Sequence, residues 1–407
     1  MIDSDLIAIT SALMKHRNWE VREQAALLIG SFATHNRACP HLMEYTFANL
    51  KEILEDPDQN VRNAAAYVFQ KLSVTASGCE CIRDTESAAQ MILSFIEHSN
   101  QENIAPEKGQ YLISLLEAFV NITFYDYGIE PLLGKNAIAQ FSTLFAAQYA
   151  VANLKPEDRT MINQLSLRVL GNMSVNHMGK QECIDNFVIK SSSYFLDESY
   201  TYLYEDALNA SLVIMSCSIH LEGKKQIVYE EDQNGEPRII KLMINRLMEY
   251  EGQESQPDLR KNLKVALTNV AELPDGFLKI CHELADADKV QILDEIFGKK
   301  SIKALHQLLP KLCQYENPPY IIGTSLELEV ENYRKYLKAM SLIFEKYQDQ
   351  AAKVAIEDTI NFSEKIAPFL NPQLMLQKEA LICLNEVKME SHQCHIVQKF
   401  LQDYGEE

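Results

Sequence analysis

The sequence has little glycine and proline, 14 and 13 residues among 407. An all-β fold needs a turn about every ten residues, and turns draw heavily on these two residue types. Their scarcity therefore disfavours a β-sandwich or a β-barrel. Hydrophobic residues make up 47% of the chain, which excludes a disordered or collagen-like protein. The composition favours a helical globular fold.

Positive charge is also in short supply, because 38 basic residues face 57 acidic ones and the net charge is -19. A chain this acidic repels nucleic-acid phosphates and anionic lipid, so we expect no nucleic-acid partner. The uncharged run 136–154 approaches the length of a membrane span, but it contains Gln140, Ser142 and Gln148. Such polar groups are costly in hydrocarbon. We expect a helix buried between other helices and no membrane insertion.

The nine cysteines show no CxxC spacing, as expected of reduced, buried thiols in a cytoplasmic protein. Acidic residues follow Met1 where a secretory signal would carry lysine or arginine. His392, Cys394 and His395, with Cys383, come nearest to a ligand cluster. A zinc site needs four converging ligands, and an exposed terminal helix explains these residues better. We expect neither a metal nor any other cofactor.

A block of residues recurs along the chain about every 40 to 50 residues. Its clearest copy runs from Val61 to Leu72 and is followed by Gly78. We call the last apolar residue of each copy its anchor. The anchors are Phe32, Leu72, Ile122, Met173, Cys217 and Val270. The residue six positions later is Ala38 in the first copy and glycine in the other five. We interpret this glycine as a helix stop.

Mostly apolar residues precede each anchor by three, four, seven and eleven positions, which is the spacing of one helix face. The residues three positions before the anchors are Ile29, Phe69, Phe119, Leu170, Ile214 and Leu267. Ser166 and Asp206 are the polar exceptions in this buried stripe. A second apolar segment, 47–54, precedes the breaker at 56–58. Units of two or three helices with this period predict an α-solenoid.

The segment from Leu54 to Ala65, with its Asp-Pro-Asp breaker followed by Val61-Arg62, resembles the armadillo repeat, and Val21-Arg22 repeats the centre of that pattern. The pairs Asn121-Ile122, Asn172-Met173 and Asn269-Val270 match the third helix of that family. The resemblance covers about residues 5 to 285 and is partly shared with HEAT repeats. It implies an all-α, right-handed α-solenoid of armadillo-like repeats.

Three segments are expected. Residues 1–316 form the repeat solenoid, and residues 317–332, which contain Pro318 and Pro319, form a loop or hinge because two prolines cannot lie inside a helix. Residues 333–407 form degenerate repeats and a helical cap, which a solenoid needs at its end.

The resemblance implies that an extended partner peptide lies along the concave face and is bound by Asn121, Asn172 and Asn269. Tyr67, Glu117 and Arg168 lie four residues before such positions and complete the candidate partner-binding set. Nuclear-import adaptors of this fold carry tryptophan there, and the only tryptophan here is Trp19. This departure argues against import-signal binding. The alternative is that the amides simply bridge neighbouring helices.

No catalytic motif is evident, and solenoids present long surfaces that bind proteins. We therefore expect a non-enzymatic interaction scaffold. Segments 33–37 and 93–96 resemble the armadillo-repeat subunit of axonemal radial spokes, which implies a structural component of the ciliary axoneme with other spoke proteins as partners. The alternative is a soluble cytosolic adaptor that binds an extended or basic peptide in the concave groove.

Overall fold

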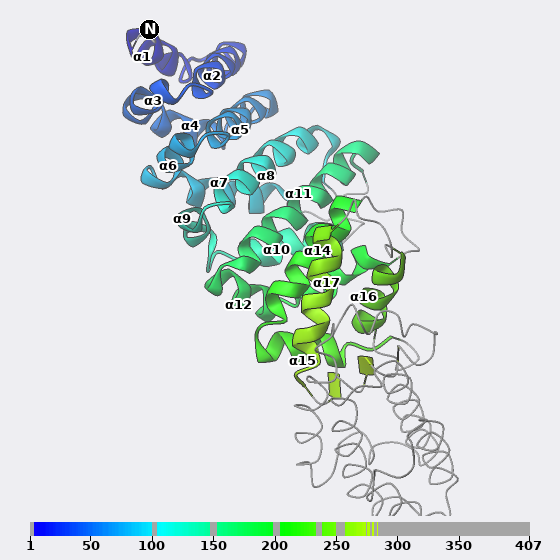
Figure 1. Ribbon diagram of the computed structural model, residues 1–407. Helices are drawn as coiled ribbons and strands as arrows, with labels where there is room; N and C mark the ends of the chain where they lie inside the picture. Colours follow the sequence, from blue (N-terminus) through cyan, green and yellow to red (C-terminus); the bar gives the residue numbers. More distant parts are fainter. Residues whose placement is uncertain are drawn as a thin grey trace, which may run out of the picture. The chain divides into compact units, whose positions relative to one another are not determined.

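The computed structural model describes residues 4–99, 104–146, 153–197, 204–232, 238–249 and 257–273, and a few positions up to 283. These residues form seventeen α-helices and four 3-10 helices (Figure 1). The predicted all-α solenoid of armadillo-like repeats is confirmed. The predicted hinge at 317–332 and the cap at 333–407 lie outside the described residues.

The chain divides into two compact units. The first comprises Met1–Phe195 and Ser199–Cys217, and the second comprises Leu196–Glu198 and Ser218–Glu407. The described residues form modules of three helices, the third of which is long. The period of about 40 to 50 residues thus corresponds to three helices rather than two.

In the first unit, α1 (Ser4–Leu13) and α2 (Trp19–Ala33) precede four modules. The modules are α3 (Cys39–Tyr45), α4 (Phe47–Ile53) and α5 (Gln59–Ser73); α6 (Ala76–Asp84), α7 (Ser87–Ser99) and α8 (Gly109–Thr123); α9 (Asp126–Ile129), α10 (Ala137–Ala146) and α11 (Pro156–Val175); and α12 (His177–Asp185), α13 (Val188–Ser193) and α14 (Tyr204–Cys217). The 3-10 helices are η1 (Asn36–Ala38), η2 (Pro106–Lys108), η3 (Glu130–Leu132) and η4 (Tyr194–Leu196). The second unit contains one further described module, which consists of α15 (Leu221–Tyr229), α16 (Arg238–Glu249) and α17 (Pro257–Val270).

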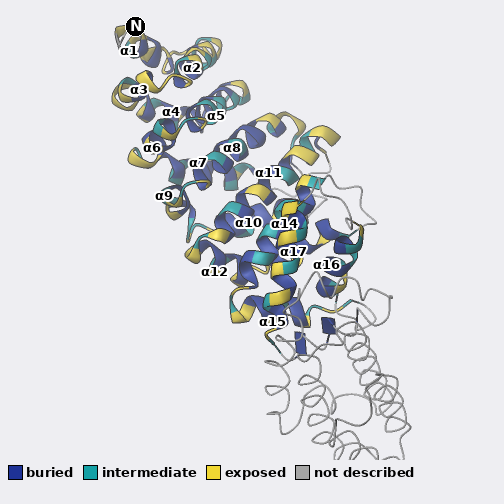
Figure 2. Ribbon diagram, viewed as in Figure 1, coloured by how far each residue is buried: buried dark blue, intermediate teal, exposed yellow. Residues whose placement is uncertain are grey.

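The long helices of the first unit pack one against the next in the order α2, α5, α8, α11, α14. The residues three positions before the anchors are fully buried in each of these helices, as the dark stretches of Figure 2 show. Ser166 and Asp206 are buried as well. The stripe predicted from the helical spacing is therefore confirmed in α5, α8, α11 and α14, where it forms the core of the unit, whereas Val21 and Leu28 of α2 are not buried.

Aromatic packing joins two successive modules at the centre of the first unit. The Phe119 ring of α8 lies 5.7 Å from the Phe95 ring of α7 and 5.6 Å from the Phe141 ring of α10. Phe141 belongs to the uncharged run 136–154, and its side chain is fully buried. The run thus supplies core packing, as expected. Among the described residues, no helix is long and apolar enough to cross a membrane.

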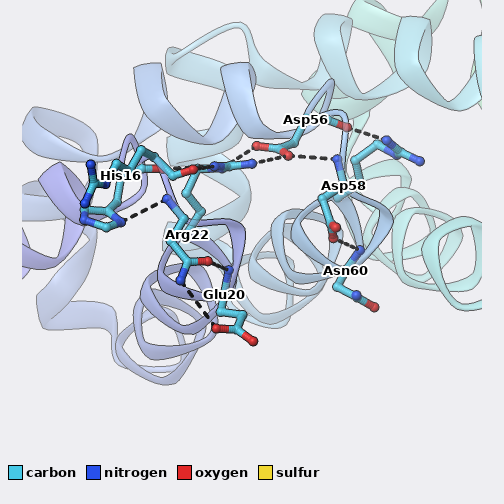
Figure 3. A network of polar contacts seen from close by, with 9 residues as sticks. His16, Glu20, Arg22, Asp56, Asp58 and Asn60 are labelled. Carbon is cyan, nitrogen blue, oxygen red and sulfur yellow. Dashed lines mark hydrogen bonds and ion pairs between the residues drawn. The ribbon is translucent and has the colours of Figure 1, made fainter.

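A buried ion pair fixes the junction between α2 and α5 (Figure 3). Arg22 donates two hydrogen bonds to the Asp56 carboxylate, with Nε–Oδ2 and Nη2–Oδ1 distances of 2.7 and 2.8 Å. Asp56 Oδ1 also accepts the backbone N–H of Asp58, and Asp58 Oδ1 caps α5 by accepting the N–H of Asn60. The Asp-Pro-Asp breaker therefore has two roles. Asp58 caps the start of α5, and Asp56 pairs with Arg22 of the preceding long helix, α2.

The repeated glycines have a different role from the one the sequence predicts. The expectation of a helix stop is wrong, because Gly78, Gly128 and Gly179 each occupy the third position of the following helix. A Cβ on these glycines would lie 1.8, 2.1 and 2.3 Å from the carbonyl oxygen of the preceding anchor. Only glycine permits this close approach of one helix to the end of the previous one.

Replacing Gly128 by alanine tests this explanation. The new Cβ would meet both the Ile122 carbonyl oxygen and, at 2.4 Å, the Ile122 Cγ2 atom, so the two helices must separate. We expect Gly128→Ala to lower the free energy of unfolding by about 1 to 3 kcal/mol, measured by urea denaturation. The control is Gly171→Ala, whose Cβ approaches only a Leu212 methyl, at 3.3 Å, and which should change stability by less than about 1 kcal/mol. Equal effects of the two substitutions would contradict the explanation.

Candidate protein-binding face

Two rows of side chains cross the long helices α5, α8 and α11. The first row, five residues before each anchor, consists of Tyr67, Glu117 and Arg168. The second row, one residue before each anchor, consists of Lys71, Asn121 and Asn172. Because residues four apart share a helix face, the two rows lie side by side. We call these six residues the ladder. Arg168 is exposed, and the other five are half-buried.

Tyr67 and Lys71 form the first rung of the ladder. The Lys71 ammonium lies 4.9 Å from the centre of the Tyr67 ring, a cation–π contact within α5. The other edge of the ring packs against Gly30 of α2, where a Cβ would lie 2.9 Å from the Tyr67 Cε1 atom. Lys71 is not among the residues predicted from the sequence, although Lys71 occupies the position that asparagine holds in the next two modules.

The asparagine amides bridge neighbouring modules. Asn121 Nδ2 donates to Ser73 Oγ at 3.1 Å. Asn172 Nδ2 donates to the Val120 carbonyl oxygen at 3.0 Å and to Thr123 Oγ1 at 3.1 Å. Both hydroxyl acceptors stand one residue after an anchor. A hydroxyl residue recurs at that position in the sequence, and this recurrence is the signal from which the hydrogen bond could have been predicted.

The same contact recurs in the second unit, where Asn269 Nδ2 donates to Ser218 Oγ at 2.9 Å. Ser218 again follows an anchor, Cys217. The helix-bridging role that the sequence left open for these amides is therefore present at all three asparagines. It engages the NH₂ groups, and no described residue donates to the Oδ1 atom of Asn121, Asn172 or Asn269. These carbonyl oxygens remain as hydrogen-bond acceptors.

Glu117 and Arg168 place opposite charges on successive modules. The Glu117 carboxylate accepts a hydrogen bond from Gln70 Nε2 of the preceding module, which holds its side chain across the helix junction. Arg168 is exposed, and no described residue forms an ion pair or hydrogen bond with its guanidinium. With Lys71, the face thus offers one anchored anion and two cations to an approaching ligand.

The cysteines of the described part of the chain are free and buried. Burial raises the pKa of Cys79 to about 11 and that of Cys81 to about 12. Cys79 Sγ donates to the Ser73 carbonyl oxygen at 3.1 Å, which keeps the thiol protonated. A thiol with so high a pKa is a poor nucleophile at neutral pH. Among the described residues, no group of three or more histidine, cysteine or acidic side chains is arranged to hold a metal ion.

A small apolar hollow of about 330 Å³ lies between α1 and α2. It is lined by Thr10, Leu13, Glu20, Val21, Gln24, Ala25 and Leu28. Val21 and Leu28 occupy stripe positions that later modules bury against the preceding long helix, and no described long helix covers that face of α2. The hollow therefore lies at the uncovered face of α2, and Glu20 is the only titratable residue that lines it.

His98 is a titratable group in an environment that disfavours its charged form. Its half-buried ring meets the Tyr111 ring edge to face at 5.1 Å, and its Nε2 atom has no hydrogen-bond partner. Burial lowers the pKa of His98, and the nearby positive charges of Lys108 and Arg62 act in the same direction. The folded protein therefore disfavours the protonated imidazole.

This environment predicts a pH dependence of stability. Because the pKa of His98 is lower in the folded state than in the unfolded state, the unfolded chain binds the extra proton as the pH falls below about 6.5. Stability contributed by the neutral ring is present above that value and is lost at lower pH. We expect wild-type protein to lose more thermal stability between about pH 7.5 and about pH 5.5 than His98→Gln does. Identical losses in the two proteins would contradict this account of His98.

Comparison with known proteins shows the fold and no more. No family model matches the sequence, and no curated protein matches it. The crystal structure of Uso1-2 is similar over 100% of this chain and 73% of its own, with a TM-score of 0.55 and 11% identity. UNC-45 from Drosophila melanogaster is similar over 98% of this chain and 53% of its own, with a TM-score of 0.50 and 13% identity.

An engineered protein is similar over 67% of this chain and 100% of its own, with a TM-score of 0.50 and 15% identity. Identities this low show a shared fold, which is the α-solenoid of the armadillo and HEAT type. Function must be argued from the exposed side chains.

Proposed function

We propose that this protein is a non-enzymatic scaffold that binds an extended segment of a protein partner along the ladder. The observation that carries the proposal is the pair of side-chain rows on α5, α8 and α11, which combine unpaired amide oxygens with an aromatic ring and opposite charges. The α-solenoid fold supports it, because stacked modules present a long surface for binding.

The ladder suits an extended chain in both spacing and chemistry. Adjacent packed helices lie about 8 to 10 Å apart, and about three residues of an extended chain in the polyproline II conformation cover the same distance and return to the same side. Backbone N–H groups of the partner donate to the Oδ1 atoms of Asn121 and Asn172. A basic side chain pairs with Glu117, and an acidic side chain pairs with Arg168. Tyr67 offers an apolar face beside them.

A charge inversion at Arg168 tests the proposal. Peptides selected from a random library on the full chain serve as probes, and their affinities are measured by fluorescence anisotropy. We expect Arg168→Glu to weaken the selected peptides at least tenfold, because an unpaired charge replaces an ion pair. Arg37→Glu makes the same charge change at an exposed position of η1, away from the ladder, and should alter affinity less than about twofold. Equal effects would contradict binding at the ladder.

The finer assignment is that the scaffold is a structural component of the ciliary axoneme of the radial-spoke type, within a cytoskeletal assembly. It rests on the sequence resemblance of segments 33–37 and 93–96 alone. The alternative is a soluble cytosolic adaptor that uses the same groove for an extended or basic peptide. Both assignments require the ladder, and they differ in whether the protein is held in a large assembly.

Fractionation separates the two assignments. For the axonemal component, we expect the protein to sediment with axonemes and to be released by salt extraction with other spoke proteins, because the salt screens polar subunit contacts. A protein found wholly in the soluble fraction of the source cell would contradict the axonemal assignment. The ladder proposal would then stand with the adaptor.

A further inference from the structure

A second surface of the first unit is apolar at the same position in successive modules. Val74, Phe124 and Val175 each follow an anchor by two residues and are 66%, 77% and 60% exposed. Met178, at the start of α12, is 59% exposed. These residues lie where α5, α8 and α11 end and where α6, α9 and α12 begin. The helices α6, α9 and α12 follow one another along one edge of the first unit (Figure 1). We call the four residues the apolar edge.

The fold does not require apolar side chains at this position. Val74 and Phe124 are C-cap residues whose N–H groups donate to the carbonyl oxygens of Leu72 and Ile122. Thr34 of α2 holds the same C-cap position with a similar backbone conformation and makes the same bond to Phe32. A polar residue therefore serves the backbone equally well. Exposed hydrophobic side chains that recur without a structural need indicate an interaction surface.

A chain of aromatic contacts leads from Phe124 through Tyr125 to Tyr127. The Phe124 and Tyr125 rings meet edge to face at 5.5 Å, and the Tyr125 and Tyr127 rings stack at 5.1 Å. The Arg83 guanidinium of α6 covers the Tyr127 ring at 4.7 Å. Aromatic side chains fixed in this way lose little entropy on binding and are common in the energetic centres of interfaces.

The charge beside the apolar edge is negative. α6, α9 and η3 carry the exposed carboxylates of Glu80, Asp84, Asp126 and Glu130. Arg83, the one cationic side chain of these three helices, pairs with Asp84 at 2.7 Å and covers Tyr127. A partner that buries its apolar side chains here must also bring its surface close to these carboxylates. A basic partner is therefore complementary to this part of the protein.

The distance between successive residues of the apolar edge matches the repeat of an α-helix better than that of a β-strand. Successive modules are about 8 to 10 Å apart, the usual separation of packed helices. Seven residues of an α-helix advance about 10 Å and return to the same helix face. In a β-strand, residues three apart cover a similar distance but point to opposite faces. One side of a helix therefore reaches Val74, Phe124 and Val175 in turn.

From these observations we propose that the apolar edge binds a basic, amphipathic α-helix of a partner protein, with apolar residues repeated every seven positions. Val74, Phe124 and Val175 come three residues after Lys71, Asn121 and Asn172, so the apolar edge adjoins the ladder at the ends of the long helices. The protein thus offers adjoining surfaces of the same modules to an extended partner segment and to a helical one.

The test uses the full chain and three synthetic peptides of equal length and charge. The first is a three-heptad helix with leucine on one stripe and lysine elsewhere. The second has the same composition with its leucines spread around the helix, and the third is rich in proline and forms a polyproline II helix. We expect the striped peptide to bind at least tenfold more tightly than either of the others, measured by fluorescence anisotropy.

Substitutions locate the binding surface. Phe124→Ser should weaken the striped peptide at least tenfold, and Val74→Ser with Val175→Ser should have a similar combined effect. Phe187→Ser is the control, because this ring is 62% exposed but lies outside the apolar edge, between α12 and α13. Since Phe124 is exposed, the variant should keep the wild-type helicity and unfolding midpoint, which a circular dichroism melt checks.

Several results would overturn the proposal. Equal binding of the scrambled or proline-rich peptide would show that the apolar edge does not select an amphipathic helix. Binding that Phe124→Ser leaves unchanged, or that Arg168→Glu weakens as much, would place the peptide elsewhere. Dimerisation of the chain at micromolar concentration that Phe124→Ser abolishes would make a second copy, rather than a partner helix, the occupant.

Discussion

A close backbone approach at the end of each long helix determines how the modules are joined. The anchor carbonyl oxygen of one helix lies almost against the third residue of the next helix, and the space left excludes any Cβ atom at Gly78, Gly128 and Gly179. The chain therefore turns within a few residues and starts the next module in the same orientation each time. Because the turn repeats, the apolar stripes of α5, α8 and α11 face one another and form a continuous core.

The same regularity creates the two surfaces that we propose as binding sites. The stripe positions are buried in α5, α8, α11 and α14, and the position two residues after the anchor recurs as an exposed row in α5, α8 and α11. The ladder arises from positions one and five residues before the anchors, and the apolar edge arises from the position two residues after them. The ladder amides also bridge neighbouring modules through their NH₂ groups, whereas the side chains of the apolar edge are mostly exposed. Function in this fold is read from the residues that the repeat leaves on the surface.

Much of the fold follows from the sequence, because the helical spacing of Phe69, Phe119 and Leu170 and the Asp-Pro-Asp breaker are local signals. The role of the glycines does not, since glycine permits both helix stops and close approaches, and only coordinates distinguish them. The Arg22–Asp56 pair and the amide bonds from Asn121 and Asn172 join residues 34 to 52 positions apart. Contacts of that range depend on how the modules stack, which no local pattern specifies.

Hydrogen exchange measured helix by helix tests the continuous core most directly. If each long helix is held by a neighbour on both sides, the amides of α5, α8 and α11 should exchange slowest and with similar opening free energies, because breaking one junction exposes the stripe of the next. The helix α1, which belongs to no complete three-helix module, should exchange faster. Exchange in α8 that is as fast as exchange in α1 would contradict a shared apolar core and the stack of modules built on it.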